Sequence, residues 1–150
     1  MDFQKINTII HAIQIQDIGM LAFVAEESFR RAYREVRDIS AQRLAVSQHV
    51  EISNRIAKMF EESIGVSGIV LQTHETWDGN GYPNKLQGEE ICIEARIIYL
   101  INYYATSMGA KPVGHERSKE ETIEKIKERR GTLFDPELVD KFIEFIQTCE

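Results

Sequence analysis

Hydrophobic residues recur at steps of three and four along most of the chain, and this spacing predicts α-helices. The first run predicts a helix over residues 3–16, and a second stretch, about 22–37, combines apolar residues with many charges. Ser40 is a candidate N-cap for a longer helix, and Gly65 and Gly68 are predicted to flank a short apolar helix. The first half of the chain is therefore predicted to consist of helices separated by short polar breaks.

The second half begins with the least helical passage of the chain. Two glycines and a proline between positions 77 and 83 predict a loop. Apolar spacing then predicts a helix over residues 93–108. The side chains expected on or near its buried side are Ile97, Ile98, Leu100, Ile101 and Tyr104.

Capping residues mark the last two helices. Ser118 and Glu121 form a capping box, which predicts a helix over residues 119–130 that stops at Gly131. A capping aspartate followed by a proline, at positions 135 and 136, begins a helix predicted over residues 136–148. Its side chains expected to point inward are Leu138, Val139, Phe142 and Phe145.

The overall pattern predicts an all-α helical bundle, because the alternation typical of strands is nearly absent. With 150 residues, 43% of them hydrophobic and 28% charged, the chain suits a single globular domain over residues 1–150. The formal net charge of −6 argues against a partner that is a nucleic acid polymer, since such binding needs a basic face.

Cysteine usage and the lack of long apolar runs predict a location. Cys92 and Cys149 form no CxxC pattern, which argues against a disulfide framework and a thiolate zinc site and favours a reducing compartment. No uninterrupted apolar run approaches the roughly 18 residues that a membrane span needs. We therefore expect a cytoplasmic protein without a membrane span.

Four landmarks follow one another in the second half of the chain. Residues 74–83 are His-Glu-Thr-Trp-Asp-Gly-Asn-Gly-Tyr-Pro, and 86–91 are Leu-Gln-Gly-Glu-Glu-Ile. Residues 94–97 are Glu-Ala-Arg-Ile, and 131–139 are Gly-Thr-Leu-Phe-Asp-Pro-Glu-Leu-Val. This succession resembles the HD-GYP family of bacterial cyclic di-GMP phosphodiesterases, an HD-domain signalling family with an all-helical fold.

The resemblance is close over residues 73–148 and looser over residues 1–72. In the looser part, residues 16–20 stand where the family has the motif HDIGK, and His49 stands at its next single histidine. The proline-glycine loop usual between those two points is replaced by residues 22–37. The resemblance also implies that part of the family's N-terminal helices is lacking.

The family's phosphodiesterases use two or three metal ions, usually iron or manganese, and the resemblance implies that this chain retains few of the ligands. The retained positions are Asp17, His49 and His74. The family's other ligands are replaced by Gln16, Thr73, Asn102 and Ala105. A neutral amide oxygen is a weak ligand, so we expect either no metal or one divalent ion, Fe, Mn or Zn, at the retained residues.

Contacts to a cyclic dinucleotide are also depleted by comparison with the family. Met20 replaces the lysine of HDIGK, and Gly114 replaces a basic residue, which removes charge-assisted hydrogen bonds to phosphate. Tyr82, Arg96 and Lys111 remain as candidate ligand contacts. A structural role in the loop is assigned to Trp77, Asp78, Gly79, Gly81 and Pro83.

Each retained residue also has a purely structural interpretation. Asp17 can cap the turn after the first helix, His49 can be a hydrogen-bonded core histidine, and His74 can anchor the loop. Tyr82 can seal the loop against the core, and Arg96 can pair with Glu75 or Asp78.

Three functions follow from these alternatives. The first is a degenerate signalling domain, a pseudoenzyme that has lost catalysis and acts by homodimerisation or by docking a signalling protein. The second is a sensor that binds cyclic di-GMP without cleaving it. The third is a metal-dependent phosphohydrolase with a reduced, single-metal site.

Overall fold

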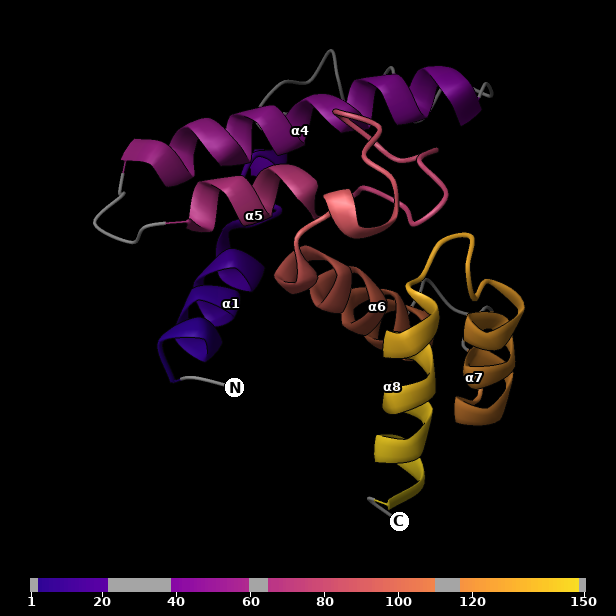
Figure 1. Cartoon of the computed structure of the whole chain (residues 1–150). Helices are drawn as coiled ribbons and strands as arrows, with labels where there is room; N and C mark the ends of the chain where they lie inside the picture. Colours follow the sequence, from indigo (N-terminus) through magenta and orange to yellow (C-terminus); the bar gives the residue numbers. More distant parts are fainter. Residues whose placement is uncertain (1–2, 22–38, 60–64, 110–116, 149–150) are drawn as a thin grey trace. The chain divides into compact units, whose positions relative to one another are not determined.

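The computed structural model describes residues 3–21, 39–59, 65–109 and 117–148, with only the backbone described for residues 39–46 (Figure 1). These stretches are helical and contain no strand, so the predicted all-α class is confirmed. The elements are α1 (Phe3–Ile15), α4 (Ile39–Met59), α5 (Val66–Gln72), the short 3-10 helix η1 (Gly88–Glu90), α6 (Ile93–Met108), α7 (Lys119–Glu128) and α8 (Pro136–Thr148). The helix predicted over residues 22–37 lies outside the described residues.

The chain divides into two compact units, Met1–His74 and Glu75–Glu150. We refer to them as the N-terminal unit and the C-terminal unit. Within the described stretches, none of the helices combines the length and the hydropathy that crossing a membrane would need.

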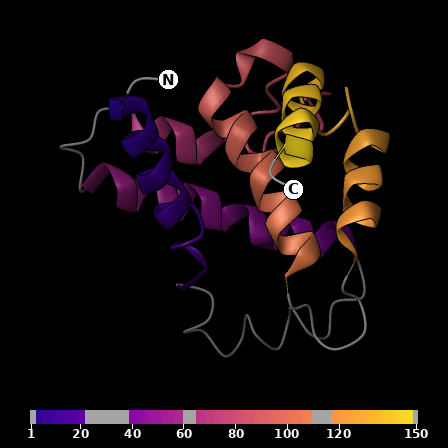
Figure 2. The same cartoon turned by 90° about the horizontal axis from the view of Figure 1, so that it is seen from below.

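In the N-terminal unit, α5 packs against both α1 and α4, as Figures 1 and 2 show. The amide of Asn54 in α4 donates to the carbonyl oxygen of Ser67 in α5 at 2.6 Å, and both groups are buried. The apolar core between these helices consists of Ile9, Ala12, Val50, Ala57, Val66, Ile69 and Val70. This packing fixes α5, the helix that leads into His74.

In the C-terminal unit, α6, α7 and α8 lie side by side around one apolar core (Figure 2). The core residues are Leu100, Ile126, Phe134 and Val139. Phe134 is 2% exposed, and the rings of Tyr99 and Tyr103 lie 5.6 and 5.1 Å from its centroid. The aromatic contacts make Phe134 the central side chain of this unit.

Most predicted helix boundaries agree with the structure to within one or two residues, as is usual for helix ends. The capping box is present, with the Glu121 amide donating to Ser118 Oγ at 3.2 Å. However, α7 ends at Glu128 rather than residue 130, and α4 begins at Ile39, which places Ser40 inside the helix. Three amides of the following turn, those of residues 132–134, donate to the Arg129 carbonyl oxygen and close α7 early.

Three positional predictions were wrong. Gly68 lies inside α5 rather than beside it, because the buried residues on either side of it stabilise the helix across its low propensity. Phe145 is 63% exposed and Ile101 is 42% exposed. The core of the C-terminal unit covers only one face of each helix, and residues turned away from that face stay in solvent even when they are apolar.

The two phenylalanines give a matched test of this core. We expect Phe134→Ala to destabilise the protein by about 3–5 kcal/mol, because it empties a buried aromatic site. Phe145→Ala should change stability by only about 0.5 kcal/mol, as surface substitutions do. Urea unfolding followed by circular dichroism measures both, and equal losses would contradict the packing described.

Candidate functional site

Three side chains from separate elements converge in the N-terminal unit. Asp17 lies in the turn after α1, His49 lies in α4, and His74 follows α5. Asp17 Oδ1 is 3.4 Å from His49 Nε2 and 3.9 Å from His74 Nε2, and the two Nε2 atoms are 3.2 Å apart. The structure thus brings together the three residues that the sequence predicted as retained ligands.

Each side chain is held by the segment that carries it. The turn after α1 is built from local hydrogen bonds, including that from the Met20 amide to the Asp17 carbonyl oxygen at 2.9 Å. His49 is 2% exposed within α4. Thr73, the C-cap of α5, donates its hydroxyl to the Val70 carbonyl oxygen at 2.9 Å and fixes the chain immediately before His74.

Burial and charge set the protonation of the three groups. The hydrogen bond with His49 lowers the pKa of Asp17, and electrostatic interaction with the two histidines adds to it against the opposing effect of desolvation. Desolvation, reinforced by the neighbouring His49, lowers the pKa of His74 to about 4. At neutral pH the site therefore holds an ionised carboxylate and a neutral His74, the forms that coordinate a metal ion.

The geometry fits a divalent metal ion. Ligand bonds of about 2.0–2.2 Å place neighbouring ligand atoms roughly 3–3.5 Å apart, close to the separations found here. All three donor atoms lie within 4.8 Å of one another. Because the Asp17 side chain is 56% exposed, further coordination positions would face solvent. Two imidazoles and one carboxylate form a donor set that suits iron or zinc.

The four residues that the resemblance assigns to further ligand positions of the family do not add to this set. Thr73 is 2% exposed, and its hydroxyl is already committed to the end of α5. Gln16 is 5% exposed, and its buried Oε1 has no hydrogen-bond partner among the described residues. Asn102 and Ala105 lie in α6 of the C-terminal unit, and neither side chain carries a charge. The described residues therefore offer ligands for one ion.

Comparison with known proteins places this chain in a family. The profile of the HD domain family matches residues 7–138. The chain belongs to the HD domain family. A 3'3'-cGAMP-specific phosphodiesterase 2 of Vibrio cholerae is 29% identical over 139 residues, which cover 92% of this chain and 26% of that protein.

Another curated relative and a solved structure are also similar to this chain. A cyclic di-GMP phosphodiesterase of Thermotoga maritima is 32% identical over 100 residues, 65% of this chain and 27% of that protein. The chain thus spans about a quarter of the length of these curated relatives. A solved structure of a cyclic GMP-AMP specific phosphodiesterase of Vibrio cholerae (V-cGAP3) shares the fold, with a TM-score of 0.73 and 19% identity over 98% of this chain and 39% of that one.

The loop that follows His74 in this HD domain is organised by Glu75, a residue that the sequence analysis treated only as a partner for Arg96. Its carboxylate accepts hydrogen bonds from the amides of Asn84 at 2.7 Å and Leu86 at 3.1 Å, although burial raises its pKa. Gly81 lies against Glu75 so closely that a Cβ there would overlap the Glu75 backbone. An acidic residue just before a glycine-rich loop is the sequence signal that could have found this role.

The loop residues themselves make the contacts of a structural element. The amides of Trp77 and Asp78 donate to the carbonyl oxygens of Leu133 and Thr132, at 3.2 and 2.8 Å. The carboxylate of Asp78 accepts from the Thr76 hydroxyl at 2.6 Å. The two backbone hydrogen bonds attach the loop to the connection between α7 and α8.

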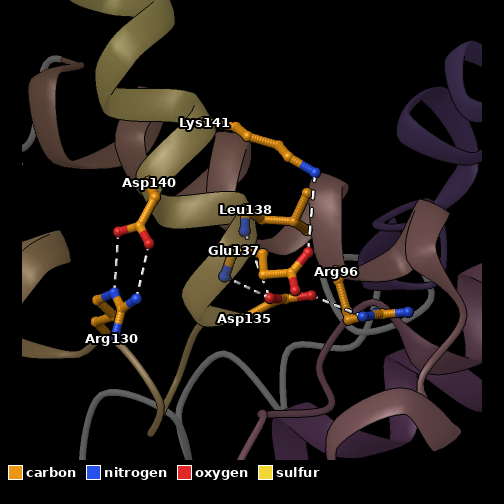
Figure 3. Close-up of polar contacts among 7 residues, drawn as sticks. All are labelled: Arg96, Arg130, Asp135, Glu137, Leu138, Asp140 and Lys141. Atoms are coloured by element: carbon orange, nitrogen blue, oxygen red, sulfur yellow. Dashed lines mark hydrogen bonds and ion pairs between the residues drawn. The ribbon is translucent and has the colours of Figure 1, made fainter.

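Arg96 pairs with Asp135, not with the predicted Glu75 or Asp78 (Figure 3). Its guanidinium donates to Asp135 Oδ2 at 2.7 Å and lies over the Trp77 ring, 5.6 Å from the centroid. Asp135 also accepts from the Glu137 amide at 2.8 Å and caps α8 as predicted. The adjoining cavity holds about 10 Å³, room for about one water molecule and far too small for a nucleotide.

The remaining predicted ligand contacts are less defined. Tyr82 is half-buried in the loop of the C-terminal unit, and Lys111 lies outside the described residues. Contacts of Tyr82 and Lys111 with a nucleotide stay a prediction.

The low pKa of His74 predicts a pH-dependent stability of the metal-free protein. The unfolded chain protonates His74 near pH 6.5, whereas the folded protein does so only near pH 4. Stability should therefore fall as the pH is lowered through this interval, by on the order of 3 kcal/mol from this residue. Urea unfolding with a chelator at several pH values measures the slope, and His74→Gln should remove this contribution. A His74 that titrates near 6.5 by NMR would contradict the prediction.

The two arginine–aspartate pairs in Figure 3 test the structural role of Arg96. Arg96→Met should destabilise the protein by about 3–5 kcal/mol, because it leaves Asp135 buried without its cation. Arg130→Met removes an exposed pair with Asp140 and should have no measurable effect on stability. Urea unfolding compares the two, and a stable Arg96→Met variant would return Arg96 to the candidate ligand contacts.

Proposed function

We propose that this HD domain holds one divalent metal ion through Asp17, His49 and His74 and has lost two-metal hydrolysis of cyclic dinucleotides. In this proposal it is a degenerate HD-GYP-type signalling domain that acts by binding a signalling protein or a second copy of itself. The observation that carries the proposal is the convergence of two imidazole nitrogens and one carboxylate oxygen, with donor atoms 3.2–3.9 Å apart.

The loss of two-metal chemistry follows from the charge of the available ligands. In such hydrolysis, two ions about 3.5–4 Å apart stabilise the attacking and the leaving oxygen together. Among the described residues, Asp17, His49 and His74 form the one group of three metal-binding side chains that converge. Gln16 and Asn102 are neutral amides, so a second ion would gain no compensating negative charge from them.

The three residues have separate roles in holding a single ion. Asp17 supplies the negative charge, and its exposed side leaves room for an incoming ligand. His49 and His74 supply nitrogen donors from rings that are largely shielded from water. A divalent ion held there would supply the capacity to polarise a phosphate oxygen or to lower the pKa of a water molecule.

Single-metal hydrolysis is the second candidate, and the exposure of Asp17 is the observation that favours it. A non-hydrolysing cyclic di-GMP sensor has less support, since Arg96 is engaged by Asp135. Assays with cyclic di-GMP, 3'3'-cGAMP and a chromogenic phosphodiester, with Fe²⁺ or Mn²⁺ added, separate these functions. Metal-dependent turnover that Asp17→Ala abolishes would replace our proposal by the hydrolase, and micromolar nucleotide binding without turnover would replace it by the sensor.

The metal site gives the sharpest prediction of the proposal. The purified protein, reconstituted without oxygen, should bind about one equivalent of iron, manganese or zinc by elemental analysis. His49→Ala and His74→Ala should each lower the metal affinity by at least about 100-fold, because each removes a direct ligand. His11→Ala, a substitution of an exposed histidine in α1, is the matched control and should bind normally. Absence of metal in the wild-type protein, or two equivalents of it, would contradict the proposal.

A further inference from the structure

The amide of Gly19 does not follow the hydrogen-bond pattern of the other amides in the turn that carries Asp17. The amides of Ile18, Met20 and Leu21 donate to carbonyl oxygens three residues earlier, at 2.9–3.1 Å. The Gly19 amide donates instead to the hydroxyl oxygen of Ser53 in α4, at 2.9 Å. Ser53 is completely buried. The turn is therefore tied to α4 by a bond that water does not reach.

A glycine is needed at position 19 because the backbone of the turn lies very close to α4. A Cβ at this position would overlap the carbonyl oxygen of His49 and would lie 2.8 Å from Ser53 Oγ and 2.9 Å from Ser53 N. Two of these three neighbours are backbone atoms of a helix, which cannot move aside cheaply. The backbone of the turn thus rests directly on the helical turn of α4 between His49 and Ser53.

This contact connects two of the candidate metal ligands. Ser53 follows His49 by four residues, so the two side chains lie on the same face of α4, one turn apart. Gly19 follows Asp17 by two residues. The turn after α1 therefore contacts α4 at two neighbouring points. Gly19 is hydrogen-bonded to Ser53, and Asp17 Oδ1 lies 3.4 Å from His49 Nε2.

We propose that Ser53, through Gly19, is a positioning residue that sets the distance between Asp17 and His49 for metal binding. The inference rests on the proposed function, because it concerns the same metal site. Ser53 does not touch the donor atoms. It fixes the backbone from which the Asp17 carboxylate reaches them, and without it the exposed carboxylate is free to turn into solvent.

The test compares Ser53→Ala with Ser107→Ala, which removes the hydroxyl of a buried serine in the C-terminal unit. Affinity is measured with Zn²⁺ against a chromophoric chelator, and geometry is measured by the visible spectrum of the Co²⁺ form. We expect Ser53→Ala to lose 10- to 100-fold in affinity, as substitutions of residues that orient metal ligands do, and to change the Co²⁺ bands. Ser107→Ala should leave both unchanged.

Two further variants keep the test decisive. Ser53→Thr, which retains an acceptor oxygen, should restore the Co²⁺ spectrum, and Gly19→Ala should lose more affinity than Ser53→Ala. Wild-type affinity and an unaltered spectrum in Ser53→Ala would overturn the inference while leaving the metal site in place. Failure of the wild-type protein to bind Zn²⁺ or Co²⁺ would instead overturn the proposed function and the inference with it.

Discussion

The backbone of the turn after α1 rests on α4 at Gly19, and the arrangement of the site depends on that contact. A side chain at this position would separate the turn from the helix, and Asp17 would move away from His49 with it. The third member, His74, is placed independently by the packing of α5 on α1 and α4. Three separate elements therefore supply one donor atom each, and their backbones are fixed before any ion binds.

Bringing these three groups together is unfavourable in free energy, and binding of a metal ion can offset this cost. Two imidazoles 3.2 Å apart cannot both be protonated without repulsion, and this repulsion adds to the desolvation that lowers the pKa of His74. A cation between them would replace that repulsion by coordination and would also neutralise Asp17. The polar cluster of the C-terminal unit differs, because the opposite charges of Arg96 and Asp135 already form an ion pair at 2.7 Å. The first cluster is suited to binding, and the second to holding a loop and a helix start together.

Local sequence signals predicted much of the fold. The spacing of apolar residues and the capping residues Ser118 and Asp135 predicted most of the described helix boundaries to within about two residues, with α5 as an exception because it continues through Gly68. The burial of Phe145 and Ile101 was predicted wrongly, because periodicity shows which residues share a face but not how wide a face the neighbouring helices cover. The partner of Arg96 was missed for a related reason. Asp135 lies 39 positions away in the chain, and only the tertiary fold brings it near.

Only part of the candidate site was predicted from the sequence. The convergence of Asp17, His49 and His74 was expected from a resemblance of motifs. The distances between their donor atoms could not be predicted from any local sequence pattern. Gly19 and Ser53 gave no signal of a shared role, since a glycine in a turn and a serine in a helix are both common. Glu75 was likewise overlooked as the residue that organises the loop, because its amide partners follow it by nine and eleven positions.

The central claim is that Asp17, His49 and His74 hold a single metal ion. Anomalous diffraction at the absorption edge of iron, from crystals grown with Fe²⁺ without oxygen, tests it most directly. Our account predicts one peak within about 2.0–2.3 Å of Asp17 Oδ1 and both Nε2 atoms. Two peaks about 3.5–4 Å apart would restore two-metal chemistry to this domain and contradict the account. A site without a peak would show that the three residues serve the fold alone.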